Sequence, residues 1–132
     1  QALSDSQSTQ TANIAVELID TLYDETATET LTSSFSIDEV SSIYNEFILS
    51  ARNKLSRCQT LLEQDPEQCI KLLHRQASTA MQLGFNSYGL ALKKIERRLL
   101  DKKPLNNSLN EASTLWQHSL EAYLKYVRQG LG

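Results

Sequence analysis

The chain is poor in the residues that catalytic and metal sites need. It has two histidines and two cysteines in 132 residues. It contains no C-x-x-C-H, H-E-x-x-H, E-x-x-H or G-x-S-x-G sequence and no Walker A phosphate loop. His74 and His118 both lie beside charged residues on polar helix faces, which is typical of solvated side chains. We therefore expect a non-enzymatic protein with no metal site and no cofactor.

Glycine, proline and long apolar runs are also scarce. Four glycines and two prolines are few for a β-rich or loop-rich fold, and no Asn-Gly or Asp-Gly hairpin turn occurs. The longest run of apolar residues and glycine covers residues 88–92, far short of the ~20 apolar residues that a membrane-spanning helix needs. We expect an all-α chain without a transmembrane segment.

Basic residues are missing from the first 51 positions, which hold nine acidic residues and so carry a charge of −9. All thirteen lysines and arginines follow, and the rest of the chain carries +6. Such segregation indicates either a polar partner surface or two segments that attract each other within one fold.

Four segments have helical periodicity: residues 9–32, 36–64, 65–102 and 108–130. Capping patterns mark three of the starts, at Ser36, at Asp65 with Pro66, and at Ser108. Short connections between amphipathic helices predict an up-down-up-down antiparallel four-helix bundle. We expect one domain over residues 9–132 after a flexible tail, residues 1–8. The third helix is predicted to be long, and residues 83–89 are the place where it would bend.

The first of these segments combines an apolar stripe with an acidic row. The stripe contains Ala12, Ala15, Leu18, Ile19 and Leu22. The row contains Glu17, Asp20 and Asp24, and carboxylates along one helix are typical of a solvated face rather than of a cation site.

Cys58 and Cys69 flank the turn between the second and third predicted helices, and both fall on apolar stripes. In an antiparallel hairpin these positions face each other, so the spacing predicts a disulfide that would stabilise the fold by ~3 kcal/mol. Two buried free thiols are the alternative. A disulfide favours an extracytoplasmic location, whether periplasmic, secreted or in an organelle lumen. The first residue, Gln1, agrees with a processed chain or an excised fragment.

Two further clusters are candidate binding surfaces. The densest charge feature is a basic run, which is typical first of a solvated face partly neutralised by the acidic first helix and second of a docking patch for an acidic protein or a membrane-associated complex; nucleic acid is disfavoured. The run contains Lys93, Lys94, Arg97, Arg98, Lys102 and Lys103. Small and aromatic residues alternate at Gly84, Phe85, Tyr88 and Gly89. The second pattern predicts close helix packing or a groove for a ligand.

An ordinary core, a segregated charge surface and the absence of catalytic motifs favour a protein-interaction module. We expect an exported accessory or adaptor protein, an immunity-type inhibitor, or a targeting subunit of a larger assembly. Two alternatives remain at this point: the extracytoplasmic ligand-sensing domain of a membrane receptor, and a bundle that binds a small ligand or cofactor.

Overall fold

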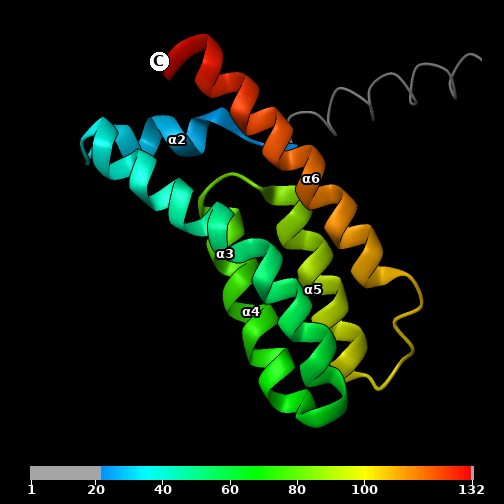
Figure 1. Cartoon of the computed structure of the whole chain (residues 1–132). Helices are drawn as coiled ribbons and strands as arrows, with labels where there is room; N and C mark the ends of the chain where they lie inside the picture. The colour runs from blue at the N-terminus through cyan, green and yellow to red at the C-terminus, as the bar shows by residue number, and fades with distance from the viewer. Residues whose placement is uncertain (1–21, 132) are drawn as a thin grey trace, which may run out of the picture.

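Helices make up all the regular structure of residues 22–131, the part of the chain that this computed structural model describes. The elements are α2 (Glu25–Thr32), α3 (Ile37–Gln64), α4 (Pro66–Gln82), α5 (Asn86–Leu100), α6 (Ser108–Tyr126) and the π-helical turn η1 (Val127–Leu131) (Figure 1). No strand occurs within residues 22–131, so the all-α prediction is confirmed. The predicted count of four helices is wrong, because five α-helices lie in this range. The predicted tail, residues 1–8, lies outside it.

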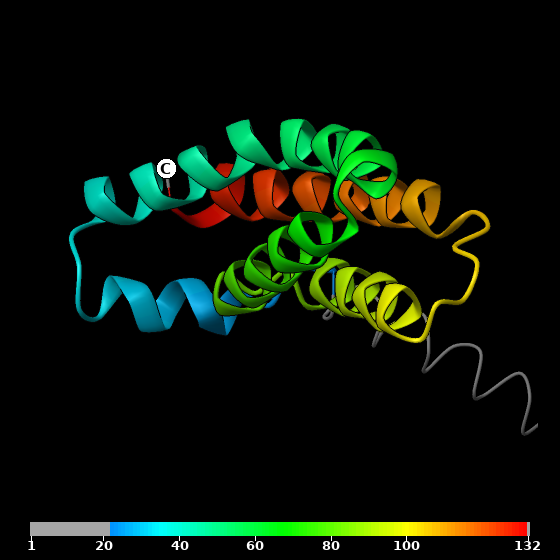
Figure 2. The same ribbon diagram turned by 90° about the horizontal axis from the view of Figure 1, so that it is seen from below.

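The four long helices α3 to α6 form a ring in which each packs against two others. They run alternately down and up (Figure 1). Viewed from below, α3 and α6 lie on one side, and α4 and α5 lie on the other (Figure 2). The short helix α2 packs against α3 at one end of the ring. None of the helices within residues 22–131 combines the length and apolar composition that crossing a membrane requires.

The predicted long third helix is wrong, since the chain reverses direction at Leu83–Phe85 and forms the α4–α5 hairpin. Gly84 has a left-handed φ of 93°. The N–H of Phe85 bonds the carbonyl of Ala80 at 2.9 Å, and that of Gly84 bonds the carbonyl of Met81 at 3.2 Å. These two bonds form a Schellman motif, the usual glycine-dependent end of a helix. The apolar stripe stays in phase across this turn, which is why periodicity did not reveal the break.

The predicted helix over residues 9–32 is also interrupted. Leu22 is helical, but Tyr23 and Asp24 are not. Asp24 instead caps α2, because its Oδ1 accepts hydrogen bonds from the N–H of Thr26 at 3.0 Å and from its hydroxyl at 2.7 Å. Asp24, assigned to an acidic row by the sequence, is thus a helix cap. The other two members of that row, Glu17 and Asp20, lie outside the described residues.

Two of the predicted helix starts are confirmed. Ser36 caps α3, and its Oγ accepts the N–H of Glu39 at 3.2 Å. Asp65 caps α4 with Pro66 in its first turn. The start of α6 differs in detail, because Asn107 rather than Ser108 is the N-cap and makes no side-chain capping bond. Local capping chemistry therefore predicted these starts to within one residue.

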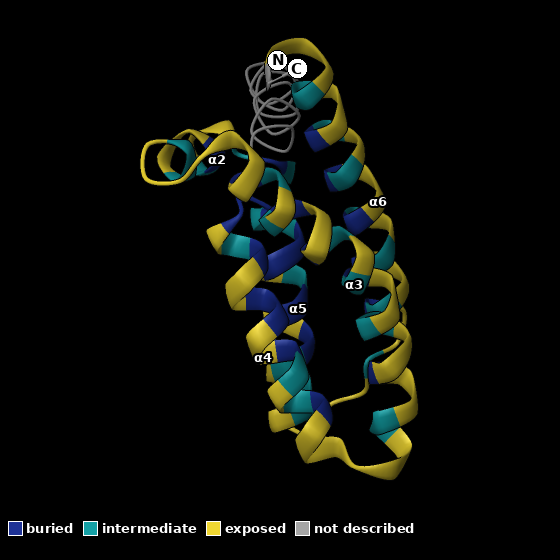
Figure 3. Cartoon of the chain, turned by 60° about the vertical axis from the view of Figure 1, so that its left-hand side comes forward, coloured by how far each residue is buried: buried dark blue, intermediate teal, exposed yellow. Residues whose placement is uncertain are grey.

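Eight of the nine aromatic side chains form one connected cluster at the centre of the bundle, leaving out only Phe35. Phe85 is fully buried, and its ring centroid lies 5.1 to 6.0 Å from those of five other rings. Figure 3 shows the buried residues on the inner faces of the helices. The residue just after the α4–α5 reversal is therefore a centre of the core.

Lys102 ends α5 in the way that Gly84 ends α4. Its φ is 55°, and the N–H of Lys103 bonds the carbonyl of Arg98 at 2.8 Å. A side chain in this conformation costs roughly 1 kcal/mol relative to glycine. Replacing Lys102 with glycine is expected to raise the free energy of unfolding by about 1 kcal/mol in denaturant titrations.

Lys103→Gly is the matched control for that substitution. It removes the same charge at a position that lacks a positive φ and is not expected to stabilise the protein. A Lys102→Gly variant less stable than the parent would contradict the reasoning.

Candidate functional site

The outer side of α5 carries a cationic surface because the inner side is apolar. Leu92 and Ile95 are buried in the core. Helical spacing therefore turns Lys93, Lys94 and Arg97 outward, and all three are exposed. Leu90 and Leu100 share this outer face, and each is 55% exposed. We call these five residues the basic face.

The structure divides the predicted basic patch into two groups. Arg98 is half-buried, and its Nη1 donates a 3.0 Å hydrogen bond to the carbonyl of Pro104. It therefore fastens the α5–α6 connection to α5. Lys102 and Lys103 are exposed in that connection, beyond the end of the helix. Only Lys93, Lys94 and Arg97 belong to one helix face.

Few acidic residues compensate the basic face. Within residues 22–131, Arg97 has an ion pair with Asp101 at 3.7 Å between Nε and Oδ2. Both side chains are exposed, and pairs of this kind contribute little to stability. Glu96, the acidic residue within α5, points to α4, where its Oε2 lies 3.2 Å from Nδ1 of His74. The face thus keeps most of its positive charge.

The acidic residues of α2 do not neutralise this charge. α2 packs on α3. The negative charges of Glu25 and Glu29 are felt by Tyr126, near the end of α6. The pKa of Tyr126 is raised by burial first and then by these two carboxylates. Glu25 and Glu29 therefore act at the end of α6, and no ion pair within residues 22–131 joins them to the basic face.

A shallow groove of about 210 Å³ adjoins the basic face between α5 and α6. Its lining comprises Ser87, Leu90, Ala91 and Lys94 from α5, and Ser108, Glu111 and Leu115 from α6. A smaller groove of about 140 Å³ lies between α3 and α6, where Trp116 and Leu55 contribute apolar surface. Ligand pockets for small molecules usually span ~300–1,000 Å³. Both grooves suit a partner's side chains better than a cofactor.

The predicted disulfide is wrong. Cys58 and Cys69 are brought together across the α3–α4 hairpin, but both are buried free thiols. Their separation of 4.1 Å is about twice a sulfur–sulfur bond, and Sγ of Cys69 donates to the carbonyl of Cys58 at 3.6 Å. A side-chain hydrogen bond with Cys69 and burial both raise the pKa of the Cys58 thiol, whereas the same bond lowers the pKa of Cys69. The spacing that predicted a disulfide is explained by core packing alone, because it places both cysteines on facing buried positions. A buried protonated thiol is a poor nucleophile.

The glycine-aromatic cluster lies in the core and lines neither of the two grooves described above. Gly84, Phe85, Tyr88 and Gly89 are all buried. A Cβ on Gly89 would lie 2.5 Å from Cγ of Met81 and 3.2 Å from the carbonyl oxygen of Ala77. The absence of a side chain therefore lets α5 approach α4 closely, which is the packing alternative that the sequence left open.

A chain of buried hydroxyls was missed by the sequence reasoning. The Tyr44 hydroxyl donates to the carbonyl of Leu83 at 2.7 Å, and Thr28 lies 2.7 Å from the Tyr44 hydroxyl. Tyr23 completes the chain by bonding Thr28. Burial raises the pKa of Tyr44 to about 12, and burial also raises the pKa of Tyr23. Both remain protonated donors at neutral pH, and the chain ties α2 to α3 and to the α4–α5 turn.

Within residues 22–131, no three His, Cys, Asp or Glu side chains converge as metal ligands. Gln76 is a polar residue on a buried stripe, and neither end of its amide has a hydrogen-bond partner there. Burial raises the pKa of Tyr88, and the nearby Gln76 amide lowers it by a smaller amount. Both side chains are enclosed by the core, where a substrate has no access.

No family model, no curated protein and no solved structure matches the chain. The site itself therefore carries the functional inference.

Proposed function

We propose that the protein is a non-enzymatic interaction module, an accessory subunit of a larger assembly, that docks an acidic protein partner on the basic face of α5. The observation that carries this proposal is the exposure of Lys93, Lys94 and Arg97 with only one weak ion pair within the described residues. Leu90 and Leu100 supply apolar contact area between them. Such a combination suits an interface in which apolar contacts give affinity and charges give orientation.

The location of this activity stays a prediction. Extracytoplasmic residence was expected because of a disulfide, and the pair consists of free thiols. An extracytoplasmic location is therefore proposed without support from the cysteines, and the docking proposal does not depend on this location.

Affinity capture from the native source, followed by titration of the recovered partner, tests the proposal. The variant Lys93→Glu, Lys94→Glu, Arg97→Glu reverses three exposed charges and is expected to weaken the partner's affinity at least about tenfold, or ~1.4 kcal/mol. The effect should shrink as salt rises, because exposed charges are screened. Circular dichroism checks that the fold is retained.

The matched control is Arg57→Glu, Lys71→Glu, Arg75→Glu. It makes the same change in net charge at exposed positions of α3 and α4, and it should bind as the parent does. Equal loss in both variants would indicate a net-charge effect and refute the specific face. Unchanged binding by the α5 variant, or turnover of a substrate without a partner, would refute the proposal.

A further inference from the structure

A second exposed surface has the opposite charge to the basic face. It lies at the turn from α2 to α3, where Phe35 is 46% and Ile37 is 55% exposed. Three exposed carboxylates belong to the same two helices: Asp38 and Glu39 in the first turn of α3, next to Ile37, and Glu29 three residues before the end of α2. We call these five residues the acidic corner.

The acidic corner lacks a basic partner of its own. No ion pair to Glu29, Asp38 or Glu39 is formed within residues 22–131, where the first basic residue is Arg52. Asp38 and Glu39 benefit from the positive end of the α3 dipole, and Glu39 accepts the hydroxyl of Ser36 at 3.1 Å. These local contacts hold the corner in place and leave its net charge negative.

The two surfaces are complementary in kind. Each presents two large exposed apolar side chains beside three charged ones, negative at the corner and positive on α5. The groove beside Leu90 and Lys94 has Leu115 and the exposed Glu111 on its α6 wall. Leu90 and Leu115 offer apolar contact for a side chain such as that of Phe35, and the positive charge lies on the α5 wall. Opposed charges around an apolar contact favour association and fix its orientation.

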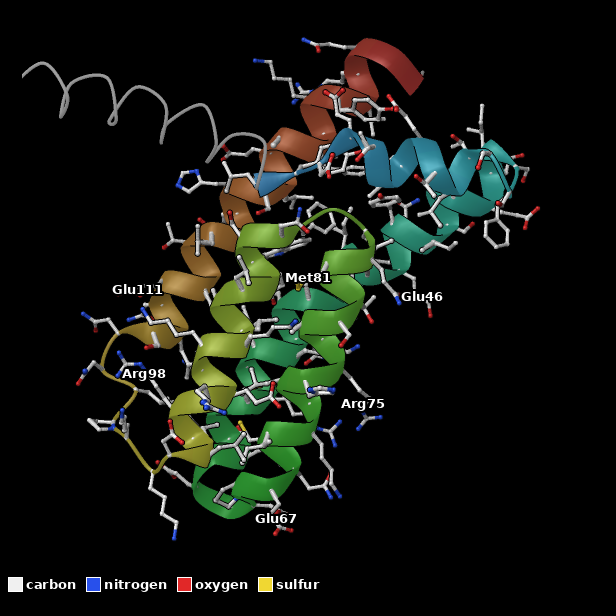
Figure 4. All side chains as sticks on the ribbon, turned by 180° about the vertical axis from the view of Figure 1, so that it is seen from behind. Glu46, Glu67, Arg75, Met81, Arg98 and Glu111 are labelled. Carbon is white, nitrogen blue, oxygen red and sulfur yellow. The ribbon has the colours of Figure 1, made fainter. Side chains whose placement is uncertain are left out.

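A single copy cannot join these surfaces to each other. The α2–α3 turn lies at one side of the molecule, and α5 with Arg98 lies at the other (Figure 4). Contact between unlike surfaces of two copies is heterologous, so each added copy leaves one free surface of each kind.

We propose that the acidic partner of the basic face is a second copy of this chain, which docks its acidic corner into the α5–α6 groove and so builds head-to-tail chains. Charge complementarity favours a second copy as the partner, because Lys94 and Arg97 of one copy would meet Asp38 and Glu29 of the other. This inference rests on the proposed function in that it names the partner of the same surface.

Sedimentation velocity of the full chain tests it through a charge swap. The parent protein is expected to reach a weight-average mass at least twice 14.9 kDa at about 20 mM salt and to return to the monomer at about 500 mM salt. Glu29→Lys, Asp38→Lys and Lys94→Glu, Arg97→Glu should each be monomeric alone. Mixing the two variants should restore association, because each positive surface then meets a negative one.

The control Arg57→Glu, Arg75→Glu carries the same charge change as the α5 variant and should associate as the parent does. A monomeric parent at low salt, or a mixture that stays monomeric, would overturn the inference. If the parent is monomeric and a different captured protein still requires Lys93, Lys94 and Arg97, the proposed function stands and this inference fails. Carbodiimide links from residues 1–21 to Lys94 within monomers would identify that segment as the occupant and would also overturn it.

Discussion

Replacing Gly84 with alanine is expected to lower the free energy of unfolding by about 3 kcal/mol. The φ of 93° at this residue disfavours any side chain. A Cβ here would also lie 2.5 Å from the carbonyl oxygen of Asp24. The backbone would have to move to relieve this close contact. Such a movement would disturb the 2.8 Å hydrogen bond from the N–H of Asp24 to the carbonyl of Gly84.

Urea titration followed by circular dichroism measures this loss, and Gly130→Ala is the matched control. A Cβ at Gly130 would meet nothing within 4 Å, so stability should change by less than about 0.5 kcal/mol. A Gly84→Ala variant within 1 kcal/mol of the parent would show that the α4–α5 turn and Asp24 shift apart cheaply.

Replacing Tyr44 with phenylalanine is expected to cost about 2–3 kcal/mol of unfolding free energy. The change removes only the hydroxyl and leaves the ring contacts, including the stack on Tyr123 with centroids 4.6 Å apart. It leaves the buried carbonyl of Leu83 without this donor and the hydroxyl of Thr28 without its acceptor. An unpaired buried polar group costs more than the net value of a hydrogen bond.

Tyr126→Phe separates this effect from the general loss of a tyrosine hydroxyl. Tyr126 is half-buried, and its hydroxyl makes no hydrogen bond within the described part of the chain, so this change should cost less than about 0.5 kcal/mol. Equal stability of the two variants in the same denaturant titration would disprove the structural role assigned to the hydroxyl chain.

Features set by neighbouring residues could be predicted. Ser36 and Asp65 start helices because their side chains bond N–H groups three residues away, whatever the rest of the chain does. The exposure of Lys93, Lys94 and Arg97 follows from the apolar positions between them on one helix. The basic face was therefore accessible to sequence reasoning, whereas the separate role of Arg98 was not, because its acceptor is the carbonyl of Pro104.

Features set by contacts between distant residues could not be predicted. Gly84 is compatible with a continuous helix or with a left-handed end, and the stripes of α4 and α5 agree with both. The choice is made where Asp24 bonds Gly84 and where Phe85 enters the aromatic cluster. Cys58 and Cys69 likewise face each other in either redox state, and only their positions in the packed core distinguish a thiol pair from a disulfide.

The sequence alone determined that this protein is helical, where α3 and α4 start, and which residues of α5 face away from its apolar stripe, because these properties depend on capping and periodicity within a few residues. Tertiary structure decided the number of helices, the state of the cysteines, the hydroxyl chain from Tyr23 to Leu83, and the separation of the acidic corner from the basic face. Those properties depend on which surfaces exclude water together, and that is fixed only when segments far apart in the chain pack against one another.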